Sequence, residues 1–199
     1  MGEKIEISWY LNEDVVLVAR QLLGKTLCTD IDGEITRGKI VETEAYSGND
    51  DKACHANNQR KTKRNEVMFS AGGRAYVYLC YGIHHLVNVV SNKEGNADAV
   101  LIRAIQPITG IDIMLKRRKM KRIEKRLTAG PGVLSQALGI TTKHYGMPLD
   151  SETIWIENEA LLDEQQIIST TRIGVEYAEE DALKPWRFYI KENDWVSRY

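Results

Sequence analysis

The sequence predicts an α/β protein of the α+β type, a single compact domain with a mostly antiparallel, curved β-sheet and flanking helices. The chain has 199 residues, enough for one hydrophobic core and too few for two comfortable domains. Short strand-like segments outnumber helical ones, and the regular strand–helix–strand spacing of a parallel sheet is absent. No linker, repeat or low-complexity tract divides the chain, so we expect one domain over residues 1–199.

The N-terminal part predicts a helix followed by a hairpin. Asn12 is a candidate N-cap for a helix over 13–23, which has an apolar stripe and ends before Gly24. Strands are expected at 25–31 and 35–46. The Asp-Gly pair between them is a strong hairpin signal, which predicts antiparallel pairing of the two strands.

The remainder predicts a long loop, further strands and two helices. The polar segment 49–65 is a long loop, and long ordered loops are often functional. A basic helix is expected at 110–125, and a short helix begins near Pro131 and ends at Gly139. Further strands are expected at 74–80, 85–91, 99–105, 153–157, 171–176 and 187–191.

Charge is distributed unevenly along the chain. The net charge is −1, yet residues 52–126 contain 16 Lys and Arg against 5 Asp and Glu, and residues 150–181 contain 10 acidic residues against one Arg. A polarised surface with one side suited to a polyanion would explain this distribution. A solvated helix face is the alternative explanation for the basic run LKRRKMKRIEKR.

Targeting and redox signals favour the cytoplasm. No apolar run approaches the roughly 20 residues that span a bilayer, and the N-terminus lacks a signal-peptide core, so we expect no membrane association. The three cysteines, Cys28, Cys54 and Cys80, form no CxxC motif and are expected to be reduced.

The segment VETEAY places polar groups where a strand should be apolar. Side chains alternate along a strand, so Glu42, Glu44 and Tyr46 point to one face. In YVYLCYG, likewise, Tyr76 and Tyr78 share a face. Together these strands suit a pocket with aromatic walls and a carboxylate that binds or activates water. A solvated sheet face and ordinary half-buried strand tyrosines would produce the same pattern.

Longer motifs separate these alternatives. KIVETEAYSGNDDKACHA, KRNEVMFSAGGRAYVYLCYGIHHLVNVV, VLIRAIQPI and LTAGPGVLSQALGI, followed by RIGVEYA and KPWRFYI, resemble the alkyladenine (3-methyladenine) DNA glycosylase family in the same order. The resemblance extends from about residue 15 to 197. It implies an enzyme that flips an alkylated or deaminated purine out of duplex DNA and hydrolyses its N-glycosidic bond.

The resemblance assigns catalytic roles to two residues. Glu44 matches the general base that activates the attacking water, and Arg103 matches the residue that helps hold the water and the carboxylate. Glu42 receives no role from the family and is expected to be structural or an electrostatic neighbour.

The resemblance also assigns the recognition of the flipped base. Tyr46, His55 and Tyr78 match residues that sandwich and edge-bind the base, and Asn88 matches one that discriminates among purines. Tyr81 matches the wedge that fills the gap left in the duplex. Stacking on the flipped base returns about 1–3 kcal/mol per base against an unstacking cost of a few kcal/mol.

Contacts with the DNA backbone are expected from basic side chains and from the turn before the short helix at Pro131. They are Arg60, Lys63, Arg64, Lys116, Arg117, Lys121, Gly130 and Gly132.

No metal or cofactor is expected. Cys54, His55, Cys80, His84 and His85 have no spacing typical of a closed zinc site. No lysine matches a Schiff-base nucleophile, so we expect a monofunctional enzyme. Its expected partner is double-stranded DNA with a damaged purine, bound by a monomer in the cytoplasm at the bacterial nucleoid.

Two other hypotheses remain open, a non-catalytic nucleic-acid binding module and a metal-dependent nucleobase hydrolase or deaminase. The sequence does not choose among 3-methyladenine, 7-methylguanine, hypoxanthine and ethenoadenine as the preferred lesion.

Overall fold

One long strand organises the sheet in the computed structural model, which describes residues 2–198. This strand, β2 (Glu34–Tyr46), pairs on one edge with β5 (Asp98–Thr109) over most of its length. Its other edge pairs first with β1 (Thr26–Ile31) and then with β8 (Arg187–Ile190). Register shifts near the middle of β2 let the strand change partners as the sheet curves.

The complete sheet is antiparallel. Its order is β3-β4-β5-β2-β1-β6, and the hairpin of β7 and β8 joins through β2. The remaining strands are β3 (Ala75–Cys80), β4 (His84–Ser91), β6 (Ile154–Glu157) and β7 (Ile167–Thr170). The predicted α+β class with a mostly antiparallel sheet is confirmed.

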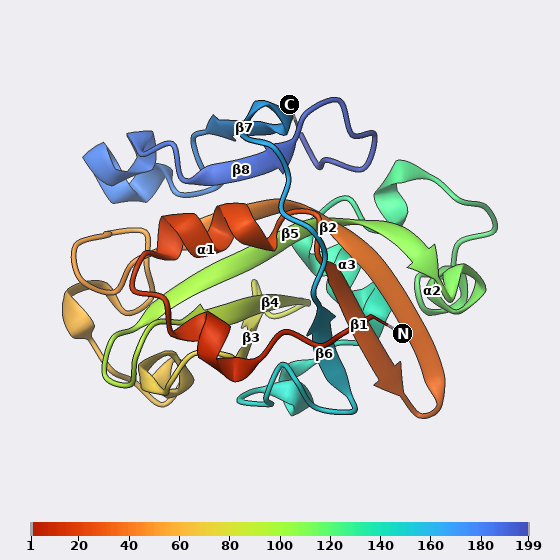
Figure 1. Cartoon of the computed structure of the whole chain (residues 1–199), viewed down its shortest axis with the longest axis horizontal. Coiled ribbons are helices and arrows are strands. Elements are labelled where there is room, and N and C mark those ends of the chain that lie inside the picture. Colours follow the sequence, from red (N-terminus) through yellow and green to blue (C-terminus); the bar gives the residue numbers. More distant parts are fainter. Residues whose placement is uncertain (1, 199) are drawn as a thin grey trace.

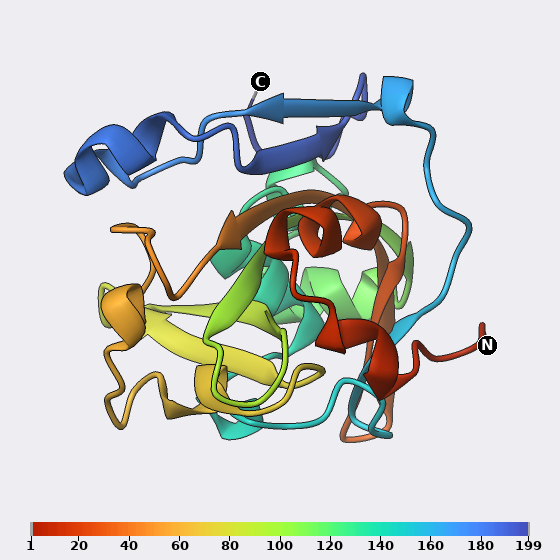
Figure 2. The same cartoon turned by 60° about the vertical axis from the view of Figure 1, so that its left-hand side comes forward.

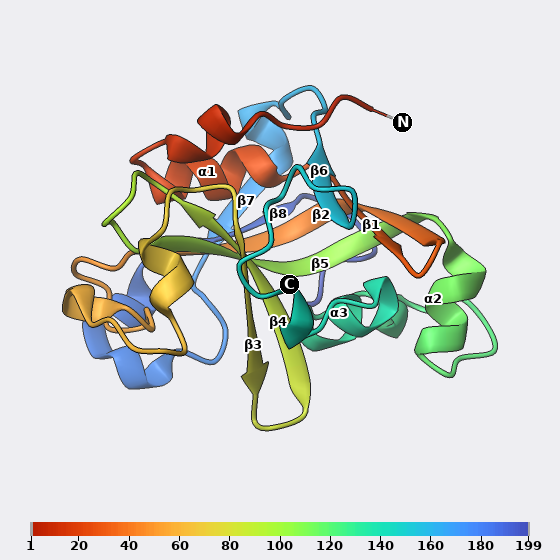
Figure 3. The same ribbon diagram turned by 90° about the horizontal axis from the view of Figure 1, so that it is seen from below.

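Helices cover both faces of this sheet. The first helix, α1 (Val15–Leu22), packs on β2 and β5 from one side, and α3 (Pro131–Leu138) packs on β4 and β5 from the other (Figures 1 and 3). Helix α2 (Ile111–Arg117) follows β5 and contacts α3. The β7–β8 hairpin lies above α1 and forms an outer edge of the molecule (Figure 2). Within residues 2–198, no helix is long and apolar enough to cross a membrane.

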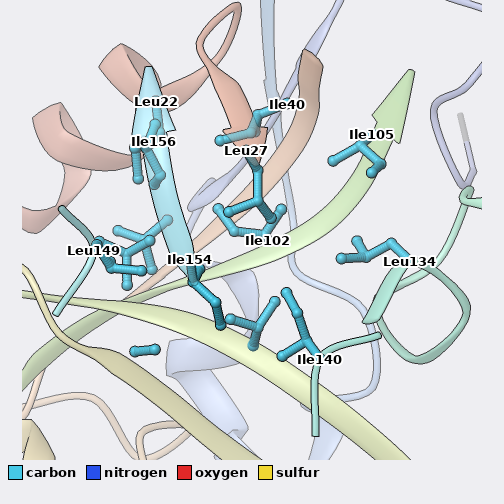
Figure 4. Packing of buried hydrophobic residues seen from close by; sticks show 14 of the residues in the cluster. Leu22, Leu27, Ile40, Ile102, Ile105, Leu134, Ile140, Leu149, Ile154 and Ile156 are labelled. Carbon is cyan, nitrogen blue, oxygen red and sulfur yellow. The ribbon is translucent and has the colours of Figure 1, made fainter. Parts of the chain in front are cut away.

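A continuous apolar core lies between the sheet and these helices. Leu22 of α1, Leu27 of β1, Ile102 of β5 and Leu134 of α3 are all almost fully buried in one cluster (Figure 4). Burying side chains of this size stabilises the folded state by about 1.5–3 kcal/mol each. The core thus provides a rigid support for the polar side chains at the β3–β4 end of the sheet.

The structure corrects the predicted start of the first helix. Asp14 caps α1 by accepting a hydrogen bond from the Leu17 N–H, and Asn12 accepts one from the Asp14 N–H. The cap is therefore two residues later than predicted. The predicted strands at 25–31, 35–46, 74–80, 85–91, 99–105, 153–157 and 187–191 are confirmed to within a few residues at their ends.

Two other predicted elements differ from the structure. The basic helix expected at 110–125 begins as predicted but ends at Arg117; the backbone takes a positive φ of 53° at Lys119, and Ile123 is exposed. The strand expected at 171–176 lies instead at β7, where four residues pair with the four of β8. Residues 171–177 leave the sheet and form a strap beside the residues that would bind a ligand.

Candidate active site

The Glu44 carboxylate lies near the end of β2, wholly buried and held by three donors. Its Oε2 accepts hydrogen bonds from the Tyr46 hydroxyl at 2.7 Å and Arg103 Nη1 at 3.2 Å. Its Oε1 accepts one at 2.7 Å from the backbone N–H of Ile173. An ionised carboxylate only accepts hydrogen bonds, so the three donors suit it. The prediction that Glu44 and Tyr46 share a strand face is confirmed.

A second carboxylate lies beside the first. Glu42 accepts hydrogen bonds from Arg103 Nε at 3.0 Å and Arg187 Nε at 2.8 Å, and the Ser197 N–H and hydroxyl also donate to it. Burial alone would raise the pKa of Glu42, but the guanidinium of Arg103 and the other donors hold that pKa below its ordinary value. Glu42 therefore remains charged, and Arg103 bridges two carboxylates.

A cavity of about 450 Å³ opens beside these carboxylates. Tyr46, Arg103 and Ile173 line it, so the donors to Glu44 form its wall and place the carboxylate directly behind them. The cavity volume falls in the range of small-molecule sites and would admit a purine ring.

Aromatic rings form another part of the wall. Tyr76 and Tyr78 lie 5.3 Å apart between ring centroids, and the His55 ring stands edge-on to Tyr78 at 4.7 Å. His55 Nδ1 is 2.8 Å from the Tyr76 hydroxyl, and Asn88 donates to the Tyr76 carbonyl. The predicted base-binding residues Tyr46, His55, Tyr78 and Asn88 all line this cavity.

The ionisation of His55 follows from this position. Burial against the cavity walls, together with the positive charge of Arg64, lowers its pKa from 6.5 to about 4. The ring is therefore neutral at pH 7 and can donate one hydrogen bond and accept another. Neutral imidazole suits the recognition of a base edge.

The strap 171–177 completes the cavity. Ile173, Val175 and Tyr177 line it, and Arg172 lies behind, with both guanidinium ends bonded to Asp51. The Arg172 guanidinium also lies 4.8 Å from the centroid of the Tyr46 ring. Sequence reasoning missed this strap because it predicted a strand there. An arginine in a stretch otherwise rich in acidic residues and the family-like motif RIGVEYA were the available signals.

The predicted wedge stands at the cavity mouth. Tyr81 lies in the turn between β3 and β4 with 91% of its surface exposed, next to Ile83 at 72%. It adopts a positive φ of 50° and belongs to the turn that follows β3, not to the strand itself. An exposed aromatic at a hairpin tip can enter a duplex without disturbing the protein.

The predicted backbone-contact residues fall into three groups, two of basic side chains and one of glycines. Arg60, Lys63 and Arg64 lie in the loop on the cavity side, with the Arg64 guanidinium 5.1 Å from the Tyr78 ring centroid. Lys63 and Arg64 also line a second, more open cavity of about 480 Å³. Lys116 and Arg117 of α2 instead pair with Glu34.

The two groups of basic side chains lie far apart. Helix α2, followed by Lys121, lies at the opposite end of the sheet from the loop 49–65 (Figures 1 and 3). Gly130 and Gly132 lie at the N-terminus of α3, where a Cβ on Gly132 would lie 3.0 Å from His84. This glycine turn therefore approaches the β3–β4 hairpin.

The described cysteine and histidine side chains form no cluster suited to a metal ion. Cys28, Cys54 and Cys80 are free thiols. Across residues 2–198, no three His, Cys, Asp or Glu side chains are arranged so that they could hold a metal ion.

Comparison with known proteins decides the family. The family model for methylpurine-DNA glycosylase matches residues 9–194. The chain belongs to the methylpurine-DNA glycosylase family. A relative from Chlamydia felis is 50% identical over 92% of this chain and 94% of its own length. A relative from Clostridium botulinum is 46% identical over 95% of this chain and 96% of its own length. A relative from Bacillus cereus is 46% identical over 93% of this chain and 95% of its own length. All three bear the provisional name 3-methyladenine DNA glycosylase.

This membership confirms the predicted family resemblance over nearly the whole chain. As a methylpurine-DNA glycosylase, the protein is a hydrolase of DNA repair that acts on altered bases in DNA. The hypothesis of a binding module without catalytic activity is thereby disfavoured.

Proposed function

We propose that the protein flips a damaged purine nucleotide from duplex DNA into the 450 Å³ cavity and hydrolyses the N-glycosidic bond with a water that Glu44 activates. The observation that best supports this proposal is the buried Glu44 carboxylate, which Tyr46, Arg103 and the strap hold at the wall of an aromatic cavity. Such a site joins base stacking to general-base catalysis.

Each wall has a part in this reaction. Tyr46 and Tyr78 stack on the base, His55 and Asn88 contact its edges, and Tyr81 enters the gap left in the duplex. These roles are supported by the lining of the cavity and by the exposure of Tyr81 at its mouth. Aromatic stacking repays part of the cost of extruding the nucleotide.

The chemical step balances without a metal or a covalent enzyme intermediate. Water bonds to the anomeric carbon of the sugar, its proton passes to Glu44, and the electron pair of the broken bond leaves with the purine. Arg103 holds the carboxylate in place. The product is an abasic site, and no lysine nucleophile is required, so we propose a monofunctional enzyme.

The wider setting follows from this proposal. The substrate is double-stranded DNA with an alkylated or deaminated purine, 3-methyladenine among them, as the names of the relatives suggest. Arg60, Lys63 and Arg64 contact phosphates near the cavity. A monomer suffices to flip one base, and we place it at the bacterial nucleoid.

The test is single-turnover base release from duplexes that carry one hypoxanthine or one alkylated purine, with EDTA present throughout. Glu44→Gln should bind damaged DNA and release base at least about 10²-fold more slowly than wild type. Glu157→Gln is the control, because Glu157 is an equally buried carboxylate paired with Arg37 at the far end of the sheet.

Each contrary result has a distinct meaning. If wild type binds damaged DNA but releases no base, the binding-module hypothesis is correct. If Glu44→Gln keeps the wild-type rate, another group activates the water. If wild type is active only without EDTA, a metal ion takes part and the proposed mechanism is wrong.

A further inference from the structure

We propose that Glu42 is a positioning residue for catalysis, which acts through Arg103 on Glu44, and that the C-terminal segment 195–198 holds Glu42 in place. The inference rests on the proposed role of Glu44 as general base. Neither Glu42 nor Ser197 lines the cavity, so neither touches the base.

The first step is the geometry of Arg103. Its guanidinium is nearly buried, with Nε on Glu42 Oε1 at 3.0 Å and Nη1 on Glu44 Oε2 at 3.2 Å. Two contacts at different ends of a planar group fix its rotation. Without the Glu42 contact, the guanidinium would be free to turn toward Glu44 and form a closer pair with it.

The second step is the balance of charge. Glu42, Glu44, Arg103 and Arg187 are all at most 7% exposed, and they form two negative and two positive charges in one buried group. Neutralising Glu42 leaves Arg187 without an ion pair and leaves Arg103 paired only with Glu44. The lone pairs of Glu44 would then be engaged by arginine and less available to a water molecule.

The third step is the support of Glu42 itself. Ser197 donates its backbone N–H to Oε2 at 2.6 Å and its hydroxyl to Oε1 at 2.9 Å. Val196 is fully buried in a small cluster with Val41 and Tyr189, and the carbonyl of Arg198 accepts a hydrogen bond from the Arg187 side chain. Residues 195–198 thus lie against the sheet beside β7 and β8 (Figures 1 and 2).

The segment 195–198 is held by both apolar and polar contacts. Trp195 packs against the same cluster, and the Ser197 contacts join residues 155 positions apart in the sequence. A segment that only covered apolar surface would not need to direct two donors at one buried carboxylate. The structure assigns it a part in ordering the active-site charges.

The experiment compares Glu42→Gln, Ser197→Ala and the control Glu157→Gln in single-turnover base release at saturating enzyme. We expect Glu42→Gln to reduce the rate 10- to 100-fold and Ser197→Ala 2- to 10-fold. The enzyme concentration that gives half the maximal rate should stay within about twofold of wild type. Glu157→Gln loses a buried carboxylate of the same kind and should keep the wild-type rate.

A double variant separates positioning from folding. In a Glu44→Gln background, adding Glu42→Gln should cause no further loss, because the group through which Glu42 acts is already disabled. A further 10-fold loss would show an independent role and overturn the proposal. Glu42→Gln at the wild-type rate would also overturn it.

Two more results are decisive. If Glu42→Gln does not fold, Ser197→Ala carries the test, and a wild-type rate in that variant contradicts the proposal. If Glu44→Gln itself releases base at the wild-type rate, the proposed function fails and this inference fails with it. A slow Glu44→Gln beside a fast Glu42→Gln overturns the positioning role alone.

Discussion

Replacing Arg172 by Met tests whether the strap depends on a buried ion pair. The Arg172 and Asp51 side chains are both fully buried, and the guanidinium donates to both Asp51 oxygens and to the carbonyls of Ala45 and Asp181. The variant leaves the Asp51 charge without its cation. Breaking a buried pair in this way costs about 3–5 kcal/mol.

This cost should be visible in thermal unfolding. For a chain of this size, each kcal/mol shifts the midpoint by about 2–4 °C, so we expect Arg172→Met to unfold roughly 6–20 °C below wild type. The control is Glu152→Gln, which removes the exposed pair with Lys4 and should change stability by less than about 1 kcal/mol.

A second substitution makes the test specific. Asp51→Asn in the Arg172→Met background removes the unpaired charge and should restore part of the lost stability. If the two side chains stabilised the fold independently, the double variant would be less stable than the single one. Unfolding is followed by circular dichroism in urea and on heating. An Arg172→Met protein within 1 kcal/mol of wild type, or a double variant less stable than the single one, would refute the reasoning.

Three further predictions use other parts of the structure. Tyr81→Ala should leave the midpoint of urea unfolding unchanged, because Tyr81 is 91% exposed. The variant should bind a damaged duplex more weakly than wild type in a titration, and equal affinity would show that the ring is no wedge. The pKa of His55 falls from 6.5 unfolded to about 4 folded, so the unfolded chain binds the proton first and stability decreases as pH drops from about 6.5 to 4. His55→Gln should reduce this loss in urea titrations at pH 7 and 4.5, and identical pH dependence would contradict the assignment. Gly110→Ala should lower the free energy of unfolding, measured in urea, by about 1–3 kcal/mol or more. The φ of Gly110 is +71°, and the new Cβ would lie 2.2 Å from the Ile35 carbonyl oxygen. An unchanged urea midpoint would mean that the turn relaxes freely.

The sequence by itself determined the parts of the site that depend on local periodicity. Alternation along one strand places Glu42, Glu44 and Tyr46 on the same side, and the structure joins Glu42 and Glu44 through one arginine. Alternation along the next strand places Tyr76 and Tyr78 in one wall. These relations hold in any extended strand, so they needed no knowledge of the fold.

Other predictions failed because local patterns do not report what an element packs against. The basic segment after residue 110 has helical composition, but its helix ends at Arg117, and the backbone takes a positive φ of 53° at Lys119. The run 171–176 resembles a strand, but the short β8 has already paired with the preceding residues. Competition for β8, and not intrinsic preference, decided the second outcome.

Only the tertiary structure decided how the active-site charges are held. Arg172 and Asp51 are 121 residues apart, and Ser197 and Glu42 are 155 apart. No periodicity relates residues at such separations, and a lone arginine or a terminal serine gives no local signal of its partner. Buried charges require partners in the folded interior, and which charges become buried together is set by the strand order that brings β2, β5 and β8 side by side.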